Sequence, residues 1–545
     1  MTTPDTLIRG GTIYDGVGGE PFVGDVLIRG NTIASITAGS LPASAIRDAH
    51  IIDADGLAVA PGFINVLSWA GEALLVDGRS QSDIRQGVTL EVLGEGWSMG
   101  PWNEAQKREC LEQQGDLRYD VAWTTLGEYL EHLVRRGVSC NVASFVGATT
   151  VRIHELGYAD RRPTPEELER MRGLVRQAMH EGALGLASAL IYVPATFADT
   201  DELVALASVA AECGGLYISH IRNESDRLLE ALNEFCEIMR RARCRGEVYH
   251  IKASGRANWG KFDALLGRIA ELRAQGEPIS ADMYTYHASS TGLDSIMPPW
   301  VQEGGLKAWI ARLRDEHVRA RVKAEMNAPG GDWDNGWRCA GGAENILLVS
   351  FRTPRLKPLA GRTLADVAAE RGLPPEDVAI QLVIEDESNV GAAFFSMSED
   401  NVRKAVRTPW VSFCSDAQSV SAEGVFLQRN PHPRTYGAFA RLLGRYVRDE
   451  QLIPLREAIR RLTSLPAENF RLAGRGRLAV GYAADVAVFD PRTIADRATF
   501  KEPHQYAVGM RHVLVNGVAV LRDGEHTGAK PGRVVRGPAW QPASG

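Results

Sequence analysis

Short apolar runs separated by turn residues mark both ends of the chain. Residues 6–16 and 25–33 are rich in β-branched residues and punctuated by glycine, which predicts a strand pair and then a hairpin. Residues 485–490 and 512–521 repeat this pattern, and residues 516–517 (Asn-Gly) predict a two-residue hairpin turn. We therefore predict that the two ends of the chain pair into one small β unit.

The middle of the chain alternates strand-like and helix-like segments. Residues 164–167 combine a threonine N-cap, a first-turn proline and a glutamate three residues on, which predicts a helix that ends near Gly182. Residues 199–202 open a second helix, and Gly214 and Gly215 end it. Such alternation implies parallel strands and right-handed crossovers, and at this length it predicts an α/β fold of the TIM (β/α)8 barrel type.

Length and composition limit the classes of protein to which the chain can belong. The 545 residues are 44% hydrophobic and 24% charged with a formal net charge of −7, which is ordinary for a globular protein of two or three structural units. The sequence has no basic run of the kind that binds nucleic acid. It also has no apolar stretch long enough to span a membrane and no signal-like start, so we expect neither a membrane protein nor a secreted one. Seven dispersed cysteines without a CxxC pair favour free thiols in the cytoplasm.

Two histidines stand at the ends of β-type runs, His220 within residues 218–224 and His250 within residues 248–255. Side chains at the carboxyl ends of barrel strands point into the mouth of the barrel, and two on neighbouring strands can meet at one metal ion. A single strand-end histidine is also explained by a hydrogen bond to a backbone carbonyl. The pair, rather than either residue, therefore carries the metal hypothesis.

Two carboxylates extend this constellation. Glu95 ends the run of residues 86–97 between two glycines, which let the backbone approach an ion, although a buried ion pair with a basic residue is an alternative. Asp416 ends residues 412–416 and could take a proton from an activated water and return it to a leaving amine. Its alternative role is to cap the following helix.

Polar residues after other strand ends could bind an anionic substrate. Lys252 lies two residues past His250, residues 282–290 carry several hydroxyls, and Arg434 can grip a carboxylate with two hydrogen bonds. Each of these is also explained as a solvated surface group.

Motifs spread over nearly the whole chain form one specific set. Together they resemble the amidohydrolase superfamily and, within it, the N-acyl-D-amino-acid deacylases (D-aminoacylases). The motifs are residues 60–64, 86–89, the two histidine segments, 284–286, 288–291, 415–416, 432–437, 484–490 and 502–506.

The resemblance implies a distorted TIM barrel over residues 63–466 and a small β-sandwich domain made of residues 1–62 and 467–545. It also implies an inserted lid-like subdomain, for which the less regular residues 292–343 are the candidate. The implied activity is hydrolysis of the amide bond of N-acyl (D-) amino acids by metal-activated water, which yields a carboxylate and a free amino acid.

Matching positions imply roles for particular residues. His220 and His250 match the family's metal histidines, and Asp416 matches its catalytic aspartate. The positions that hold the substrate carboxylate in the family are matched by Lys252, Tyr284, Ser290 and Arg434.

Two departures from the family pattern concern the metal. The family's Asp-x-His-x-His motif is absent, because the chain reads Asn65-Val66-Leu67-Ser68-Trp69 there and leucine and serine cannot replace the histidines as nitrogen ligands. Glu95 stands where the deacylases have a bridging cysteine. We therefore predict a mononuclear site of Glu95, His220 and His250. It would hold one divalent metal ion, Zn²⁺ by preference, with Mn²⁺, Co²⁺ or Fe²⁺ admitted by the harder oxygen ligand.

Two alternatives compete with this hypothesis. The lost histidines open space that Trp69 and Trp97 would line, which also suits another amide, a cyclic amide, a lactone, a carbamate or a small peptide. The second alternative is a non-catalytic binding protein that keeps the barrel fold but has lost the enzymatic activity. The acyl group, the stereochemistry and any homo-oligomer are left open by the residues themselves.

Overall fold

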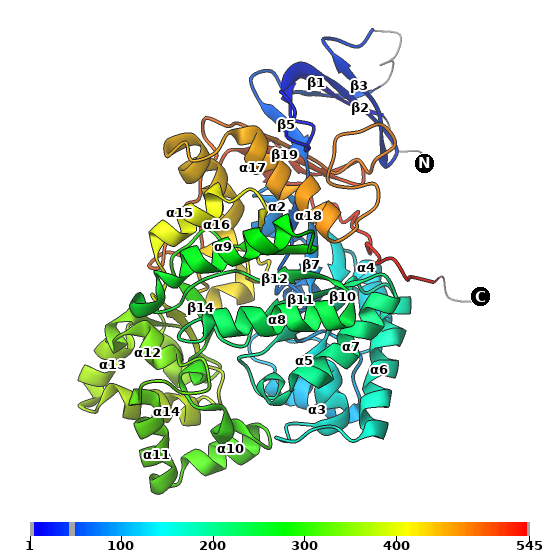
Figure 1. Ribbon diagram of the computed structural model, residues 1–545. Coiled ribbons are helices and arrows are strands. Elements are labelled where there is room, and N and C mark those ends of the chain that lie inside the picture. The colour runs from blue at the N-terminus through cyan, green and yellow to red at the C-terminus, as the bar shows by residue number, and fades with distance from the viewer. Residues whose placement is uncertain (1–4, 43–48, 542–545) are drawn as a thin grey trace.

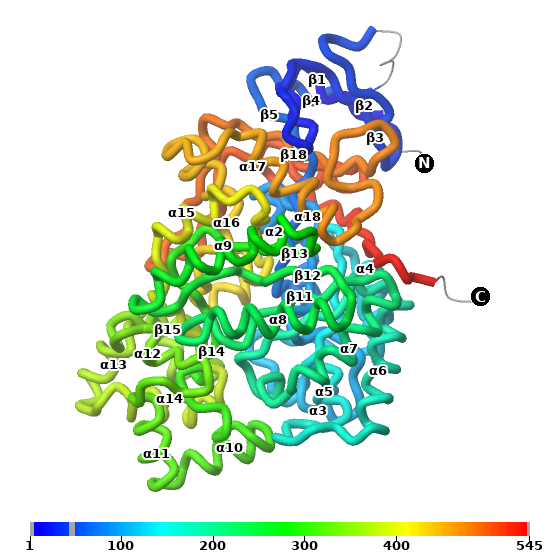
Figure 2. The backbone as a smooth tube through the Cα atoms, in the orientation of Figure 1, coloured from blue at the N-terminus to red at the C-terminus, as the bar shows by residue number. Residues whose placement is uncertain are grey.

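The computed structural model describes residues 5–42 and 49–541. Figure 1 shows the first strands at the top, a central region in which helices surround further strands, and a separate group of helices at the lower left. The tube in Figure 2 shows that the amino-terminal (blue) segments lie next to carboxyl-terminal (orange) segments.

Strands from both ends of the chain form one sheet, which confirms the predicted pairing of the ends. Within the described residues this sheet has nine strands, and β5 (Ala58–Pro61) pairs antiparallel with β18 (Val486–Phe489). The predicted turn at residues 516–517 is confirmed, with φ of 48° and 80°, between β19 and β20. The remaining strands are β1 (Thr6–Ile13), β2 (Phe22–Arg29), β3 (Thr32–Ala38), β4 (His50–Asp53), β19 (Met510–Val515), β20 (Val518–Arg522) and β21 (Glu525–His526).

One prediction for this region was wrong. Residues 6–16, predicted as a strand pair, contain the single strand β1, because Gly10 has φ of 71° and the register shifts between Ile8 and Gly11. A glycine in this conformation inserts extra length as a bulge without reversing the chain. The predicted hairpin of residues 25–33 is confirmed between β2 and β3. The structure assigns all these strands to one sheet, so a two-layered sandwich is not confirmed.

Parallel strands run through the centre of the chain, as predicted. They form two sheets, ordered β6-β7-β8 and β17-β13-β12-β11-β10-β9, rather than one closed barrel. Backbone contacts link the two sheets: Ser68 bridges Ala417, and the Leu184 N–H donates to the Ser144 carbonyl at 2.9 Å. The strands are β6 (Phe63–Asn65), β7 (Val88–Leu93), β8 (Asn141–Ser144), β9 (Val146–Gly147), β10 (Gly185–Ala189), β11 (Leu216–His220), β12 (Arg245–Val248), β13 (Ile279–Met283) and β17 (Val411–Phe413).

Helices alternate with these strands, and both predicted helix starts are confirmed. Thr164 forms a capping box at the start of α6 (Pro165–His180), and Asp199 caps α7 (Thr200–Glu212). The other α-helices and the π-helix of this part are α1 (Ala73–Val76), α2 (Gln81–Ile84), α3 (Glu104–Gln113), α4 (Leu126–Arg136), α5 (Ala148–Leu156), α8 (Leu228–Ala242), α9 (Lys261–Ala274), α15 (Glu399–Arg407), α16 (Arg434–Arg441), η9 (Leu442–Asp449), α17 (Leu455–Leu462) and α18 (Ser464–Asn469).

A second apolar core lies in the helical group at the lower left of Figure 1. Its buried residues run from Leu293 to Phe394, so the predicted insertion of residues 292–343 lies within a longer unit. The antiparallel sheet β14-β16-β15 brings the first and the last strand of this unit side by side. Its elements are β14 (Ser289–Gly292), α10 (Leu306–Leu313), α11 (Glu316–Asn327), α12 (Gly336–Ala340), β15 (Ile346–Ser350), α13 (Leu364–Arg371), α14 (Pro375–Glu385) and β16 (Gly391–Phe394).

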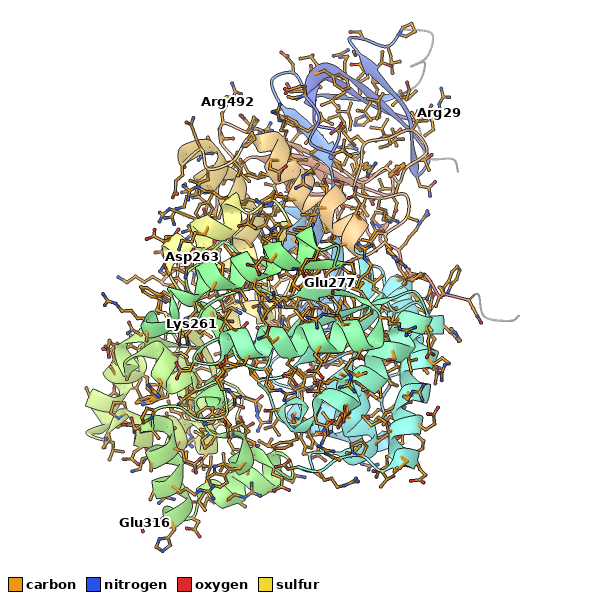
Figure 3. All side chains as sticks on the ribbon, in the orientation of Figure 1. Arg29, Lys261, Asp263, Glu277, Glu316 and Arg492 are labelled. Carbon is orange, nitrogen blue, oxygen red and sulfur yellow. The ribbon has the colours of Figure 1, made fainter. Side chains whose placement is uncertain are left out.

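Charged side chains project from the outside of the molecule. Arg29, Glu316 and Arg492 are exposed and project away from the ribbon in Figure 3. Among the residues that the structure describes, none of the helices combines the length and the apolar character that a bilayer span requires.

Candidate active site

Three strand ends bring the predicted metal ligands together. His220 is the last residue of β11, and His250 follows the end of β12 by two residues. Glu95 follows the end of β7 by two residues. The strands are parallel, so their carboxyl ends share one rim of the fold, and the three side chains converge there.

The loop that carries Glu95 depends on a glycine. Gly94 has φ of 105°, and a Cβ at this position would lie 2.4 Å from the Phe145 carbonyl oxygen. Only glycine tolerates both the conformation and the close approach. The glycines beside Glu95 were the feature of the sequence that pointed to this residue.

The three side chains form a compact, buried set. One ligand atom from each lies within 4.8 Å of the others, and Glu95 Oε1 is 3.2 Å from His220 Nδ1 and 2.9 Å from His250 Nε2. Each side chain is at most 5% exposed. Two imidazoles and one carboxylate are a donor set that zinc takes in catalytic sites, with one position left for water. The residues therefore fit a divalent metal ion.

Glu224 completes the cluster and was missed by sequence reasoning. It lies in the loop after β11, and its two carboxylate oxygens each lie 3.3 Å from a ring nitrogen, one of His220 and one of His250. Lys252 Nζ lies 2.7 Å from Glu224 Oε1. The one signal in the sequence was its position four residues after His220. Many surface carboxylates in loops have a similar spacing from a histidine, so this position did not identify Glu224 as part of the site.

The charges of this cluster are strongly coupled. Burial alone would raise the pKa of Glu95 and of Glu224, but the facing His220 and His250 outweigh burial and lower both pKa values. Burial and Lys252 disfavour the charged form of His250, yet the two carboxylates raise its pKa to about 10. The two ionised carboxylates thus create a negative environment that favours a cation, and a bound metal ion would displace the proton of His250, because a ligating imidazole is neutral.

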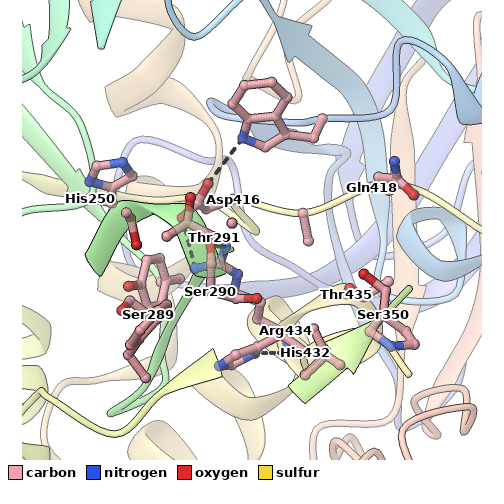
Figure 4. A pocket seen from close by; sticks show the side chains of 18 of the residues that line it. His250, Ser289, Ser290, Thr291, Ser350, Asp416, Gln418, His432, Arg434 and Thr435 are labelled. Carbon is pink, nitrogen blue, oxygen red and sulfur yellow. Dashed lines mark hydrogen bonds and ion pairs between the residues drawn. The ribbon is translucent and has the colours of Figure 1, made fainter. Parts of the chain in front are cut away.

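Asp416 lies beside the cluster, three residues past the end of β17. Its Oδ2 is 2.7 Å from Arg434, and its Oδ1 accepts a hydrogen bond from the Trp69 indole at 3.2 Å. Figure 4 shows this hydrogen bond as a dashed line that ends at Asp416. Burial raises the pKa of Asp416 although Arg434 opposes the shift. A carboxylate with a raised pKa is suited to accept and return a proton.

The four residues predicted to hold a substrate carboxylate line one cavity of about 500 Å³, together with the metal-ligand candidates. Arg434 begins α16, packs over the Tyr284 ring at 4.5 Å and donates to the Ser290 carbonyl at 3.2 Å. Figure 4 shows Arg434 and Ser290 near Asp416. Lys252 donates to Glu224, while Tyr284 donates to the sulfur of Met397. The structure brings these groups together, and their binding of substrate stays a prediction.

Aromatic side chains form part of the same cavity. Trp69 and Trp97 both line it, as predicted, and the Trp97 ring lies 5.6 Å from that of Tyr192. The Tyr192 ring in turn meets the His220 ring edge-on at 5.5 Å. No pattern in the sequence pointed to Tyr192 as a residue of the cavity, because its position depends on the turn after β10.

Comparison with known proteins agrees with this geometry. The model of a family described as the amidohydrolase family matches residues 50–521. An N-acyl-D-glutamate deacylase from Alcaligenes xylosoxydans xylosoxydans is 33% identical to the chain, and the match covers 98% of this chain and 96% of that protein.

Solved structures give the same result. A D-aminoacylase structure, described with a binuclear metal centre, has a TM-score of 0.81 and 32% identity, covering 98% of this chain and 100% of that one. An N-acyl-D-glutamate deacylase from Bordetella bronchiseptica, in complex with zinc and a phosphonate inhibitor, has a TM-score of 0.79, 32% identity and the same coverage. On this evidence the chain belongs to the amidohydrolase family.

Proposed function

We propose that the chain is a metal-dependent hydrolase of N-acyl-D-amino acids. The observation that carries the proposal is the buried set of Glu95, His220 and His250, with Asp416 beside it in one cavity. The names of relatives at 32–33% identity support the substrate class. The parallel strands and the two links between their sheets support a distorted (β/α)8 barrel, and the dispersed free cysteines support a cytoplasmic location.

Glu95, His220 and His250 would hold one divalent ion, which we propose to be Zn²⁺. When bound, the ion would supply Lewis acidity that polarises the amide carbonyl and acidifies water. Leu67 and Trp69, which cannot serve as ligands, support a single ion.

The side chains of this protein would perform the remaining steps. Asp416 would take the proton of the attacking water on its carboxylate and return it to the leaving nitrogen, because it lies beside the ligand set. Arg434, Lys252, Tyr284 and Ser290 would hold the substrate carboxylate. Burial of these groups excludes bulk water from the reacting amide and so strengthens each charge interaction.

The test begins with metal content and turnover. Elemental analysis of the wild type is expected to give about one metal equivalent per chain, which the double variant H220A/H250A loses. Kinetics on N-acetyl-D-amino acids and their L enantiomers are expected to show D preference. The variant D416N is expected to keep its metal and to lose at least ~100-fold in kcat.

The matched control is H50A/H317A, which removes two exposed histidines outside the cavity. It should keep both metal and activity. A wild type without metal after incubation with zinc, or an unchanged kcat in D416N, would contradict the proposed mechanism.

A further inference from the structure

Trp69 lies between the two strand ends that lead to the carboxylates of Glu95 and Asp416. The Trp69 backbone N–H donates to the Ala417 carbonyl at 2.9 Å, beside Asp416. The preceding residue, Ser68, donates to Val92 of β7, the strand that leads to Glu95, at 2.8 Å. The main chain therefore holds the indole ring in the gap between Glu95 and Asp416.

The indole N–H is shared by both carboxylates. Trp69 Nε1 is 3.0 Å from Glu95 Oε2 and 3.2 Å from Asp416 Oδ1. The positive end of one N–H dipole thus lies between the carboxylates of Glu95 and Asp416, which would otherwise repel each other in a buried site. A hydrogen bond to an ionised group is stronger than a neutral one, so the arrangement constrains both carboxylates.

The two oxygens of Glu95 consequently have different partners. Oε1 faces His220 and His250, while Oε2 is occupied by Trp69. Oε1 of Glu95 faces the histidines and Oδ2 of Asp416 pairs with Arg434, so the oxygens left for an ion that both carboxylates share are Oε2 and Oδ1. These are the two atoms that the indole binds. The indole nitrogen is a donor without a lone pair for a metal, so it fills that place without being a ligand.

We propose that Trp69 is a positioning residue whose indole N–H stands where Glu95 and Asp416 would share a second cation. It limits the site to one metal ion and holds Asp416 toward that ion. This inference rests on the proposed function, but it concerns the number of ions and the placement of Asp416 rather than the identity of the substrate.

Asp416 is held from two sides in this arrangement. Arg434 binds Oδ2 at 2.7 Å, and Trp69 binds Oδ1. Without the indole N–H, Arg434 is the one side-chain partner left to the Asp416 carboxylate among the described residues, and the carboxylate can then turn away from the reacting water. The expected effect is on the proton-transfer step, seen in kcat, rather than on substrate binding, seen in KM.

The first variant is W69F, which keeps an aromatic ring and removes the N–H. We expect about one metal equivalent, because the phenyl ring still fills the place of a second ion and offers no ligand atom. We expect a kcat lowered by about 10- to 100-fold and a KM within about twofold of the wild type. The visible absorption spectrum of the Co²⁺-loaded enzyme should change, because Glu95 Oε2 is released.

The matched control is W300F. The Trp300 indole also donates to a carboxylate, that of Glu325 at 2.7 Å, but it lies in the inserted unit. It should leave kcat, metal content and the Co²⁺ spectrum unchanged.

The second variant, W69H, places a nitrogen with a lone pair between the same carboxylates. Glu95, Asp416 and the new imidazole would then supply three ligands, so elemental analysis after incubation with excess Zn²⁺ should give about two equivalents. This result is independent of W69F, and so it tests the proposal even if W69F fails to fold.

Two outcomes would overturn the inference. One is a W69F enzyme with wild-type kcat and an unaltered Co²⁺ spectrum; the other is a folded W69H that still binds one equivalent. Metal counts and spectra require no turnover. If the wild type hydrolyses no N-acyl-D-amino acid, the proposed function fails while the role of Trp69 is still decided.

Discussion

Glu224 shows how single side chains set the properties of the site. It contacts both candidate metal histidines at 3.3 Å and Lys252 at 2.7 Å, and it is buried. Carboxylates that hydrogen-bond to metal-ligating imidazoles fix the ring orientation and raise the basicity of the ligand. Glu224 therefore supports His220 and His250 from the side opposite Glu95.

We predict that E224Q binds Zn²⁺ about 10- to 100-fold more weakly than the wild type, because the two imidazoles lose a charged partner. Competition with a chelator of known affinity would measure the change. The control is E234Q, whose carboxylate pairs with Arg222 outside the cavity and should leave the affinity unchanged. Equal affinities in E224Q and wild type would show that Glu224 does not support the ligands.

At the scale of elements, Glu399 joins the start of α15 to η9. Its carboxylate accepts a hydrogen bond from Tyr446 at 2.6 Å and lies 3.0 Å from Arg445. Burial opposes the charged form, but His287, Tyr446 and the nearby arginines outweigh it and lower the pKa of Glu399 from 4.5 to about 2. The folded state therefore favours the ionised carboxylate.

A depressed pKa stabilises the fold above pH 4.5, and this contribution is lost as the pH falls from 4.5 towards 2. We predict that E399Q lowers the free energy of unfolding by about 1–2 kcal/mol at pH 7, after allowance for partial exposure of the site. Calorimetry should show the difference in Tm between E399Q and wild type shrinking as the pH falls.

The control for this prediction is D400N, the next residue, whose carboxylate is 83% exposed. Its Tm should stay within a degree or so of the wild type, as is usual for surface pairs. A difference between E399Q and wild type that grows on acidification would refute the assigned pKa shift.

At the scale of the whole molecule, a buried polar junction ties the carboxyl-terminal strands to β8 of the parallel sheets. Asp485, just before β18, accepts hydrogen bonds from the Asn516 backbone N–H at 2.8 Å and the Asn141 amide at 3.3 Å, and it also pairs with Arg475. Asn141 begins β8, so this junction joins segments more than 300 residues apart.

We predict that D485A lowers the free energy of unfolding by about 3 kcal/mol, because it removes the buried acceptor that Arg475, the Asn141 amide and the Asn516 backbone N–H share. Thermal unfolding followed by calorimetry, with limited proteolysis of the carboxyl-terminal strands, would measure the loss. D53A removes an exposed ion pair of the same sheet and should have little effect. A Tm for D485A equal to that of D53A would exclude this junction as a source of stability.

The sequence by itself determined the features that local patterns encode. Alternation of strands and helices, the capping of α6 and α7 and the turn at residues 516–517 follow from short-range propensities. His220, His250 and Glu95 could be predicted because parallel strands carry their carboxyl ends to one rim, so position on a strand implies position in space.

Only the tertiary structure decided the partners of these residues. The bulge in β1 was mistaken for a turn because glycine signals both. The contacts of Glu224 and Trp69 depend on where loops settle, and no local pattern encodes the distance of Trp69 from Asp416, which is 347 residues away in the chain. Local sequence encodes backbone geometry, whereas the meeting of distant side chains in a buried site depends on packing of the whole molecule.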